Sequence, residues 1–438
     1  MTSETQAQAP AQVPMTPWAR IKAIAGGSAG NLVEWFDWFA YSAFSLYFAK
    51  TFFPRGDSTA QLLQTAAVFA VGFLMRPVGA WIMGLYADRV GRKAALTLSV
   101  GVMSAGSFAV ALIPGYATIG VAAPILLTLC RMIQGLSLGG EYGASATYMS
   151  EMAGRERRGF WSSFQFSTLI AGQLMSVVVL MILQALLTRA QLEAFGWRIP
   201  FLIGGVLAIV VFWMRTGLEE SASFNNAKQA GEPRARTMML FLKHPKETAM
   251  IFALTAAGSL AFYAFTTYMQ KFLKNTVGFS DEVATRINAA SLLCYMLIQP
   301  LFGWLGDKVG RKHVMAFSFA CLTLFTYPLM TTLAGTHDPL SAFLLVLAAL
   351  VMLSGYTATN AVVKAEMFPA HVRALGVALP YALANAVFGG TAEYIALYLK
   401  QQHVEAYFYI YVSAIALGAL VVALRLRDTA KHSQILED

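Results

Sequence analysis

A ten-residue pattern of charges and glycines occurs twice in this chain, 219 residues apart, and each copy lies between two long apolar segments. A charged turn at the same place in both halves of an apolar chain indicates an internal duplication. In membrane proteins, halves related in this way are typical of transporters, whose binding site lies between them. The two copies run Gly84-x-x-x-Asp88-Arg89-x-Gly91-Arg92-Lys93 and Gly303-x-x-x-Asp307-Lys308-x-Gly310-Arg311-Lys312.

The composition is that of a chain whose solvent is lipid. Of its 438 residues, 57% are hydrophobic and 13% are charged, whereas soluble domains carry about 25% charged residues. Three cysteines, Cys130, Cys294 and Cys321, lie in apolar segments and form no C-x-x-C pair. We therefore expect them to pack as small side chains, and we expect no metal site.

Twelve apolar segments are long enough to cross a bilayer as helices, which takes about 20 residues. Helix is the expected structure because hydrocarbon offers no hydrogen-bond partner to an open backbone. We predict an all-α membrane protein with twelve transmembrane helices in two six-helix, pseudo-symmetric bundles. The segments are 21–48, 59–87, 94–113, 120–148, 160–187, 197–214, 248–272, 283–305, 314–334, 340–363, 374–397 and 406–426.

Lysine and arginine are distributed unevenly over the segments that connect these spans. With both termini placed in the cytoplasm, and residues within four positions of a span end counted with the adjoining segment, the cytoplasmic segments hold 22 of the 32 basic residues and the outer segments, with Lys271 among them, hold 8. Two more, Arg76 and Arg131, lie deep inside spans. Positive charge collects on the cytoplasmic side of membrane proteins, so we predict that both termini are cytoplasmic. The same distribution explains the net charge of +9 without nucleic acid as a partner.

The longest hydrophilic stretch divides six spans from six. A second repeat supports this division, because a glutamate and an arginine seven residues apart follow both the fourth and the tenth span, as Glu151 with Arg158 and Glu366 with Arg373. We predict a disordered cytoplasmic tail over 1–16, an N-terminal six-helix bundle over 17–214, a cytoplasmic linker over 215–247, a C-terminal six-helix bundle over 248–427 and a cytoplasmic tail over 428–438.

The repeated turn has residues suited to a tight reversal of the chain. Gly91 and Gly310 permit backbone angles that other residues resist. Asp88 and Asp307 can accept hydrogen bonds from the exposed N–H groups of a nearby helix start, where negative charge is favoured. A basic turn that only fixes the topology remains the alternative.

Arginine and glutamate of the two repeats can close the cytoplasmic side. We predict that Arg92 pairs with Glu151 and that Arg311 pairs with Glu366. An exposed ion pair is worth at most about 1 kcal/mol, which suits a latch that has to open. The residues assigned to this gate are Gly84, Asp88, Gly91, Arg92, Glu151 and Arg158 in the first half and Gly303, Asp307, Gly310, Arg311, Glu366 and Arg373 in the second.

These turns resemble the signature loop of the major facilitator superfamily. Further segments resemble its metabolite–proton symporter family, and within it the carriers of α-ketoglutarate. The resemblance implies symport of this dicarboxylate with protons, by alternating access, across a bacterial inner membrane. The segments include Asn31-Leu32-Val33-Glu34-Trp35-Phe36-Asp37, Arg76-Pro77-Val78-Gly79, Arg131-x-x-Gln134-Gly135, Gly196-Trp197-Arg198-Ile199-Pro200-Phe201, Lys364-Ala365-Glu366-Met367-Phe368-Pro369 and Phe388-Gly389-Gly390-Thr391-Ala392-Glu393-Tyr394.

Ionisable groups inside the spans are few, and each is costly unless it faces a cavity or a partner. We predict that Arg76 and Arg131 bind a carboxylate substrate, because a guanidinium can hold a carboxylate through two hydrogen bonds. Glu34 and Asp37, three residues apart on one helix face, are predicted to carry protons. Glu141 is a further candidate for this role.

The resemblance implies that Asp37 pairs with Arg131 and releases it on protonation. Structural alternatives stay open for each buried charge. The pair can be a permanent salt bridge that fixes helix packing, and Glu141 can brace the inner end of its helix. Arg76, which precedes a proline, can position a kink.

Tyr263, Gln299 and Lys364 are weaker candidates for substrate binding. Each can equally bond a neighbouring helix, and Lys364 can anchor the inner end of the tenth span. The sequence contains no Ser/His/Asp grouping, metal-ligand spacing or phosphate-binding loop, so we do not predict an enzyme or a cofactor beyond the co-transported proton. The predicted partners are a small organic anion, in particular a dicarboxylate, protons and the bilayer. Another organic acid, a zwitterionic osmolyte and, more remotely, a metabolite receptor are the alternatives.

Overall fold

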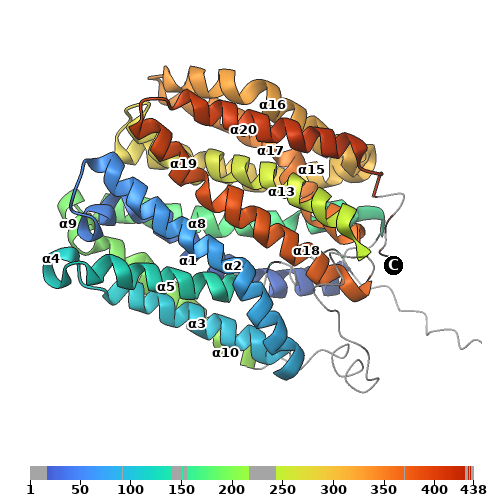
Figure 1. Ribbon diagram of the computed structural model, residues 1–438, viewed down its shortest axis with the longest axis horizontal. Helices are drawn as coiled ribbons and strands as arrows, with labels where there is room; N and C mark the ends of the chain where they lie inside the picture. Colours follow the sequence, from blue (N-terminus) through green and yellow to red (C-terminus); the bar gives the residue numbers. More distant parts are fainter. Residues whose placement is uncertain are drawn as a thin grey trace, which may run out of the picture.

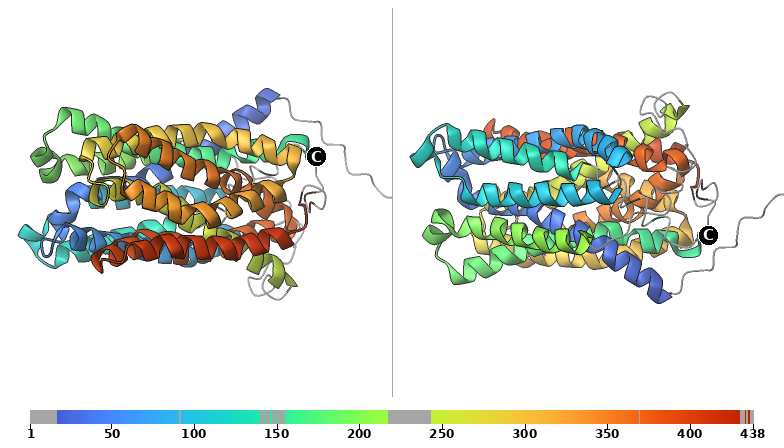
Figure 2. Two further views of the ribbon diagram at one scale, coloured as in Figure 1. Left: turned by 90° about the horizontal axis from the view of Figure 1, so that it is seen from above. Right: turned by 90° about the horizontal axis from the view of Figure 1, so that it is seen from below.

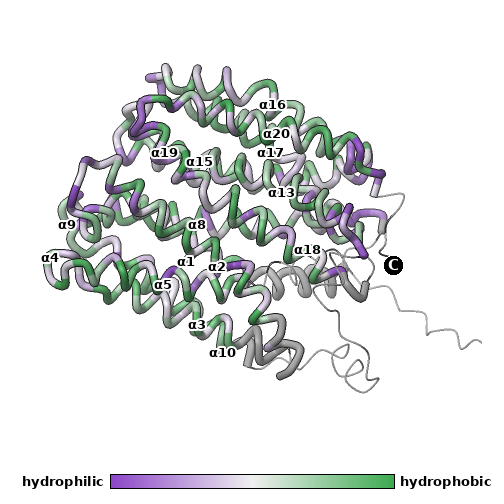
Figure 3. The backbone as a smooth tube through the Cα atoms, viewed as in Figure 1, coloured by the Kyte–Doolittle hydropathy of each residue, from purple (hydrophilic) through white to green (hydrophobic). Residues whose placement is uncertain are grey.

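The structure is a computed structural model that describes most of the chain as long helices (Figure 1). Nine of the described helical segments are long and apolar enough to cross a membrane, and two shorter apolar helices cover Leu98–Leu112 and Ala122–Leu138. Hydrophobic residues dominate the helices, and hydrophilic ones collect toward their ends (Figure 3). The described residues are 17–90, 92–139, 142, 146, 150, 155–216, 243–368, 370–429, 433 and 435.

The first half of the chain contributes six long helices. In this half α1 packs against α8 and α10, α2 packs against α5, and α3 packs against α5 and α10. The long helices are α1 (Pro17–Phe52), α2 (Ser58–Val90), α3 (Arg92–Leu112), α5 (Ala122–Leu138), α8 (Phe164–Leu186) and α10 (Ile199–Thr216). Short connecting elements are α4 (Tyr116–Ile119), η1 (Arg155–Arg157), α7 (Arg158–Ser162), α9 (Arg189–Ala194) and η2 (Gly196–Arg198).

The second half repeats this plan with two interrupted helices. Here α15 packs against α17, α16 packs against α17 and α20, and α13 packs against α18 and α20. The elements are α13 (Pro245–Phe265), α14 (Met269–Asn275), α15 (Asp281–Val309), α16 (Arg311–Ala334), α17 (Pro339–Glu366), α18 (Ala370–Ala384), the π-helix η3 (Asn385–Gly389), α19 (Gly390–Gln401) and α20 (Ala406–Arg425).

Two helix pairs, α8 with α15 and α2 with α19, join the two halves. The long helices run side by side along a common axis in both views of Figure 2. With α1 counted beside the eleven apolar helices of the described residues, the fold is the predicted all-helical one of twelve crossings in two six-helix bundles. Phe39 of α1 also packs its ring near that of Phe262 of α13, so the seam between the bundles lies along α1, α2 and α8 on one side and α13, α15 and α19 on the other.

Two spans that we expected to be continuous helices are interrupted. The span 248–272 is divided between α13 and α14, where the amide of Tyr268 donates to the carbonyl of Tyr263, 2.9 Å away. The span 374–397 contains the π-helix η3. Apolar periodicity does not reveal such breaks, because an interrupted helix is as hydrophobic as a continuous one. Interrupted helices at membrane depth are tolerated where they are buried in protein or line a cavity.

Glycines set the close approach of α2 and α5. A Cβ atom on Gly135 would lie 2.0 Å from the carbonyl oxygen of Gly72, and one on Gly139 would lie 2.1 Å from the carbonyl oxygen of Arg76. These are backbone atoms, which cannot turn aside as a flexible side chain can. The two helices can therefore keep this spacing only with glycine at both positions of α5.

Replacing Gly135 by valine should lower the stability of the folded protein by at least about 1–3 kcal/mol, because the added atoms force α2 away from α5. The thermal melting temperature of the purified protein in detergent measures this effect. Gly418→Val in α20 is the matched control, since nothing lies within 4 Å of a Cβ at Gly418. Equal melting temperatures for the two variants would contradict the packing argument.

Candidate functional site

Asp37 of α1 lies at the centre of a buried hydrogen-bond network in the first bundle. Its carboxylate accepts a hydrogen bond from the Ser107 hydroxyl of α3 at 2.5 Å and one from the Gln134 amide of α5 at 2.9 Å. The Gln134 carbonyl oxygen accepts from Nη1 of Arg131 at 2.8 Å. Gln134 thus links the acid and the guanidinium, which the sequence suggested would pair directly. A change in the charge of Asp37 reaches Arg131 through one amide side chain.

Two buried arginines of the first bundle stack on the same tryptophan. The guanidinium carbon of Arg76 lies 4.3 Å from the ring centre of Trp38, and that of Arg131 lies 4.1 Å from it. Arg131 also contacts the ring of Tyr41, and Arg76 contacts that of Phe73. Within the described part of the chain, Nε and Nη2 of both arginines have no hydrogen-bond partner. Aromatic faces stabilise these cations without using their N–H groups.

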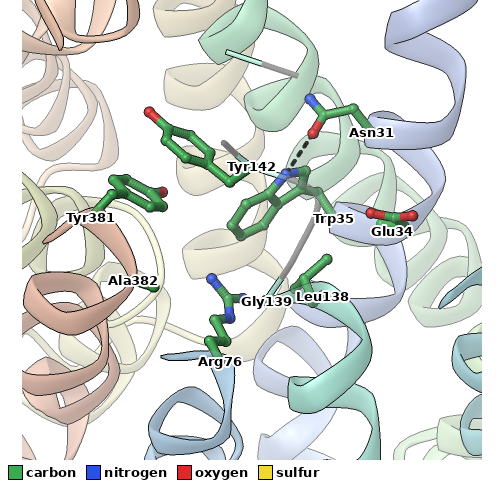
Figure 4. Close-up of a pocket in the computed structure, with 9 residues that line it drawn as sticks. All are labelled: Asn31, Glu34, Trp35, Arg76, Leu138, Gly139, Tyr142, Tyr381 and Ala382. Carbon is green, nitrogen blue, oxygen red and sulfur yellow. Dashed lines mark hydrogen bonds between the residues drawn. The ribbon is translucent and has the colours of Figure 1, made fainter. Parts of the chain in front are cut away.

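A small cavity lies beside Arg76, between the two bundles (Figure 4). Its volume is about 10 Å³, which is about the space that one water molecule needs. Tyr142 of the first half and Tyr381 of the second stack face to face, with ring centres 3.5 Å apart. The rings occupy the space where the bundles meet. The lining residues are Asn31, Glu34, Trp35, Arg76, Leu138, Gly139, Tyr142, Tyr381 and Ala382.

Lys364 of α17 approaches the same tyrosines from the second bundle. Its Nζ lies 4.5 Å from the ring centre of Tyr381 and 5.9 Å from that of Tyr142. The ammonium is buried, with no hydrogen-bond partner among the described residues. Arg76 and Lys364 therefore face the tyrosine pair from opposite bundles, and both carry N–H groups that can bind an acceptor.

We call the end of the seam that carries Asp307, Arg311 and Glu366 the motif end, and the opposite end the far end. At the motif end Glu366 is buried and binds Arg158 of the other bundle, 3.3 Å away. Glu366 also forms an ion pair with Arg311, which binds Asp307 at 2.9 Å. Breaking the contact between Glu366 and Arg158 is necessary if the bundles are to separate at this end.

Asp307 makes a second contact across the motif end. Its two carboxylate oxygens accept hydrogen bonds from the amides of Gly159 and Phe160, at 2.8 and 2.9 Å, where α7 begins. A Cβ on Gly303 would lie 2.6 Å from the carbonyl oxygen of Gly159, so α15 and α7 touch through backbone. Gly310 reverses the chain between α15 and α16 with a φ of +102°, which glycine adopts without strain.

The far end is closed by different residues. Asp281 of α15 binds Arg189 of α9 at 2.7 Å and Lys274 of α14 at 2.5 Å. Gln184 of α8 donates to Thr285 of α15 at 3.2 Å. Among the described residues both ends of the seam are thus bridged, and the cavity beside Arg76 holds about one water.

Deeper in the far half lies a three-residue ring, which we call the Ser42 ring. Nζ of Lys271 (α14) lies 2.6 Å from Glu393 (α19) and donates to the hydroxyl of Ser42 (α1) at 2.7 Å. The Ser42 hydroxyl in turn donates to the other oxygen of Glu393 at 3.0 Å. All three side chains are buried. The ring joins a charged pair of the second bundle to α1 of the first.

Comparison with known families decides what kind of fold this is. Residues 24–250 match the model of the family described as "Sugar (and other) transporter", and residues 274–437 match that of the "Major Facilitator Superfamily". The chain belongs to the major facilitator superfamily. It is therefore a multi-pass membrane protein of a family of metabolite transporters.

Relatives of this major facilitator cover nearly its whole length. It is 51% identical to the α-ketoglutarate permease of Escherichia coli K12, over 95% of this chain and 96% of that one. It is 34% identical to a citrate–proton symporter of Klebsiella pneumoniae, over 85% and 84% of the two chains. An inner membrane metabolite transport protein of Escherichia coli K12 is 32% identical, over 95% and 96%.

The superfamily fold is also seen in solved structures. The proton–xylose symporter XylE of Escherichia coli, bound to 6-bromo-6-deoxy-D-glucose, aligns with a TM-score of 0.77 at 16% identity, covering 95% of this chain and 98% of that one. A partially occluded, inward-open form of XylE aligns with a TM-score of 0.72 at 18% identity, covering 93% and 97%. At these identities the likeness shows the fold of this facilitator.

The sequence-predicted site residues fall into three groups in this facilitator. Arg76, Arg131 and Asp37 lie close to Trp38, and Glu34 lines the cavity. Tyr263 packs its ring 5.1 Å from Phe73, beside Arg76. Gln299 instead bonds within the second bundle, accepting from Thr357 at 2.8 Å and donating to Ser354 at 3.3 Å.

The structure describes some of the predicted gate residues fully and others only in part. Arg373 is buried, and its Nε donates to the carbonyl of Phe368 at 3.2 Å. Gly84 and Asp88 lie near the end of α2 and Arg92 begins α3, but their side chains are outside the described residues. Of the predicted site residues, Gly91, Glu141 and Glu151 lie outside the described part altogether. The same is true of the segments 1–16 and 217–242 and of most of the C-terminal tail.

Three features of the site were not among the sequence predictions. Gln134 shares a helix face with Arg131, but its bridging role depends on where α1 lies. Lys271 stands near the end of an apolar span and was grouped with the outer, solvated charges, although it is buried. Its position directly after Gln270, and about one turn after Thr266 and Thr267, was the available signal, because these residues are polar within an apolar span. The Tyr142–Tyr381 stack joins residues from different halves, and nothing local in the sequence links them.

Proposed function

We propose that this protein is a secondary active transporter that imports α-ketoglutarate together with protons by alternating access. It acts in a bacterial inner membrane, with the motif end and both termini facing the cytoplasm. The relatives support the substrate class, since α-ketoglutarate and citrate are the cargo in their names and both are multivalent carboxylates. The orientation is supported by the bias of basic residues toward the motif end.

The observation that carries this proposal is the pair of buried cations, Arg76 beside the cavity and Lys364 beside the ring of Tyr381, that approach the Tyr142–Tyr381 stack from opposite bundles. Arg76 belongs to α2 and Lys364 to α17, and each has N–H groups without a partner in the described structure. A buried unpaired cation is costly, so it marks a place where an anion binds. A dicarboxylate has one carboxylate for each bundle, and it can draw both bundles together once Tyr142 and Tyr381 move apart.

Asp37 is the proposed proton carrier of the first bundle. In its ionised form the carboxylate holds Gln134, and Gln134 holds Arg131. A proton on Asp37 removes the negative charge that balances Arg131, so the guanidinium then favours a substrate carboxylate. The proton and the organic anion therefore support each other's binding, which is the requirement for symport.

The gate follows from the contacts at the motif end. Arg158 and the amides of Gly159 and Phe160 bind Glu366 and Asp307 across the seam. When these contacts break, the site opens to the cytoplasm while the far end stays closed by Asp281 and Arg189. Different residues bridge the two ends, Arg158 with Glu366 at the motif end and Arg189 with Asp281 at the far end, so one end can open while the other stays closed.

Uptake of labelled α-ketoglutarate into proteoliposomes with an imposed pH gradient, acid outside, tests the proposed function. We expect accumulation that a protonophore abolishes and that unlabelled dicarboxylates inhibit. Proline and betaine, named as cargo of other relatives, serve as zwitterionic competitors and should inhibit weakly, because two cations are poorly matched to one carboxylate. Inhibition by betaine but not by dicarboxylates would contradict the proposal.

At least two protons should accompany each α-ketoglutarate. The substrate is a dianion at neutral pH, and a cycle with one proton would move a net negative charge into a negative interior at a cost of about 2.3 kcal/mol per 100 mV. Two protons make the cycle electroneutral. Reversal potentials measured over a series of pH and substrate gradients give the ratio. A ratio of one proton per substrate would remove this prediction.

A further inference from the structure

We propose that Glu393 is a second proton-carrying carboxylate of this transporter, which exchanges its ion pair with Lys271 for a proton when the far end of the seam opens. The inference rests on the proposed function and deepens it, because it supplies the second of the two protons that a dianion requires. It does not depend on which organic acid is carried.

The Ser42 ring closes only when the two bundles touch at the far end. Lys271 and Glu393 both belong to the second bundle, whereas Ser42 belongs to α1. The Ser42 hydroxyl accepts a hydrogen bond from the ammonium and donates one to the carboxylate, so it satisfies both charges. When α1 moves away from α14 and α19, the ring loses Ser42 and the acid becomes accessible to water from that side.

Protonation of Glu393 changes the charge balance of its surroundings. Lys271 is the cation within ion-pair distance of it among the described residues. Tyr41 of α1 and Tyr268, between α13 and α14, are other titratable groups of the described residues that interact electrostatically with Glu393. Both phenols are buried and hydrogen-bonded, Tyr41 to the carbonyl of Thr65 and Tyr268 to Glu405. A proton on Glu393 therefore leaves Lys271 as an uncompensated buried charge.

This charge imbalance couples the proton to the anion. When Glu393 is ionised and no substrate is bound, the charge of Glu393 balances that of Lys271, and the seam can close. A seam with protonated Glu393 and no substrate buries one extra positive charge, which opposes closing. When the dianion enters, one proton on Asp37 and one on Glu393 cancel its two charges, so the loaded seam closes with the same net charge as the empty one.

The ring also lies close to the proposed substrate site. Ser42 follows Trp38 by four residues on α1, which is about 6 Å along the helix axis. Trp38 contacts both Arg76 and Arg131, and Tyr41 contacts Arg131 at 4.6 Å and interacts electrostatically with Glu393. The two acid–base units, Asp37 with Arg131 and Glu393 with Lys271, thus both contact α1 within about two helical turns, at Asp37 and at Ser42.

Glu393→Gln, reconstituted in proteoliposomes, tests the inference through two measurements. Exchange of labelled for unlabelled α-ketoglutarate requires no net proton movement, and we expect it to persist. The reversal potential should give one proton fewer per substrate than the wild type. A wild-type proton ratio in Glu393→Gln would overturn the proposal.

Two further variants separate coupling from folding. Glu393→Asp keeps the carboxylate and should keep the wild-type ratio. Lys271→Gln/Glu393→Gln leaves no lone buried charge, and it should exchange substrate and also carry one proton fewer. Loss of exchange in the double variant as well as in Glu393→Gln would assign the Ser42 ring a purely structural role and overturn the proposal. If the wild type rejects α-ketoglutarate but carries citrate, the proposed substrate is wrong, and the same ratios measured with citrate still decide the role of Glu393.

Discussion

Arg76→Ala should reduce the apparent affinity for α-ketoglutarate by about 10- to 150-fold, because hydrogen bonds to a charged group contribute about 1.5–3 kcal/mol. Arg76 is buried at the cavity, and its Nε and Nη2 have no other partner among the described residues. Initial rates of uptake over a range of substrate concentrations measure the change. Arg76→Lys keeps the charge but loses the planar pair of donors, so it should recover only part of the affinity.

Arg198→Ala is the matched control for Arg76. This arginine ends η2, just before α10, where it is partly exposed, stacks on Trp197 and donates to the carbonyls of Ala194 and Ile113. Its removal should leave substrate affinity near that of the wild type. If Arg76→Ala binds α-ketoglutarate as well as Arg198→Ala does, the substrate is not held where the two bundles meet at Arg76.

Asp37→Asn should strongly reduce accumulation of substrate against its gradient while exchange across the membrane continues. Asparagine has nearly the same shape and can still bond Ser107 and Gln134, but it cannot release a proton. Arg131 then lacks its counter-charge at every stage of the cycle, so the carrier stays in the form that favours the anion. Steady-state accumulation under a pH gradient should fall well below that of the wild type, because Glu393 is then the one proposed proton carrier left.

Asp338→Asn makes the same chemical change outside the membrane-spanning part. Asp338 is exposed at the start of α17, where its carboxylate accepts a hydrogen bond from the amide of Ser341. This variant should accumulate substrate as the wild type does. Uphill accumulation by Asp37→Asn comparable to that of Asp338→Asn would show that another group carries the first proton.

Much of the fold follows from the sequence because lipid leaves the backbone little choice. Segments of sufficient apolar length must be helices, and the duplicated turn places the division between the bundles. The interruptions at Thr266 and at η3 did not follow, since they depend on local hydrogen bonds rather than on hydropathy. The ends of the helices also differ by a few residues, because apolar patterns fade before the hydrogen-bonded turns do.

The site was predictable where a charge was improbable in its surroundings. Arg76, Arg131 and Asp37 stand out because each is ionisable within an apolar run. Gln134 and Lys271 did not stand out, since an amide is common in helix contacts and a lysine near a span end usually reaches water. Their roles depend on which helices are neighbours and how each is rotated, and both are set by the packing of the two bundles.

The close packing of Tyr142 against Tyr381 has a consequence for the cell's energy supply. A carrier returns empty once in each cycle, and any water-filled chamber would then ferry hydrated ions or hydronium across the membrane without cargo. Here the stacked rings of Tyr142 and Tyr381 leave about 10 Å³, too little for a hydrated ion. A carrier that returns with the rings packed in this way works as a plug, so idle turnover does not dissipate the proton gradient that powers import.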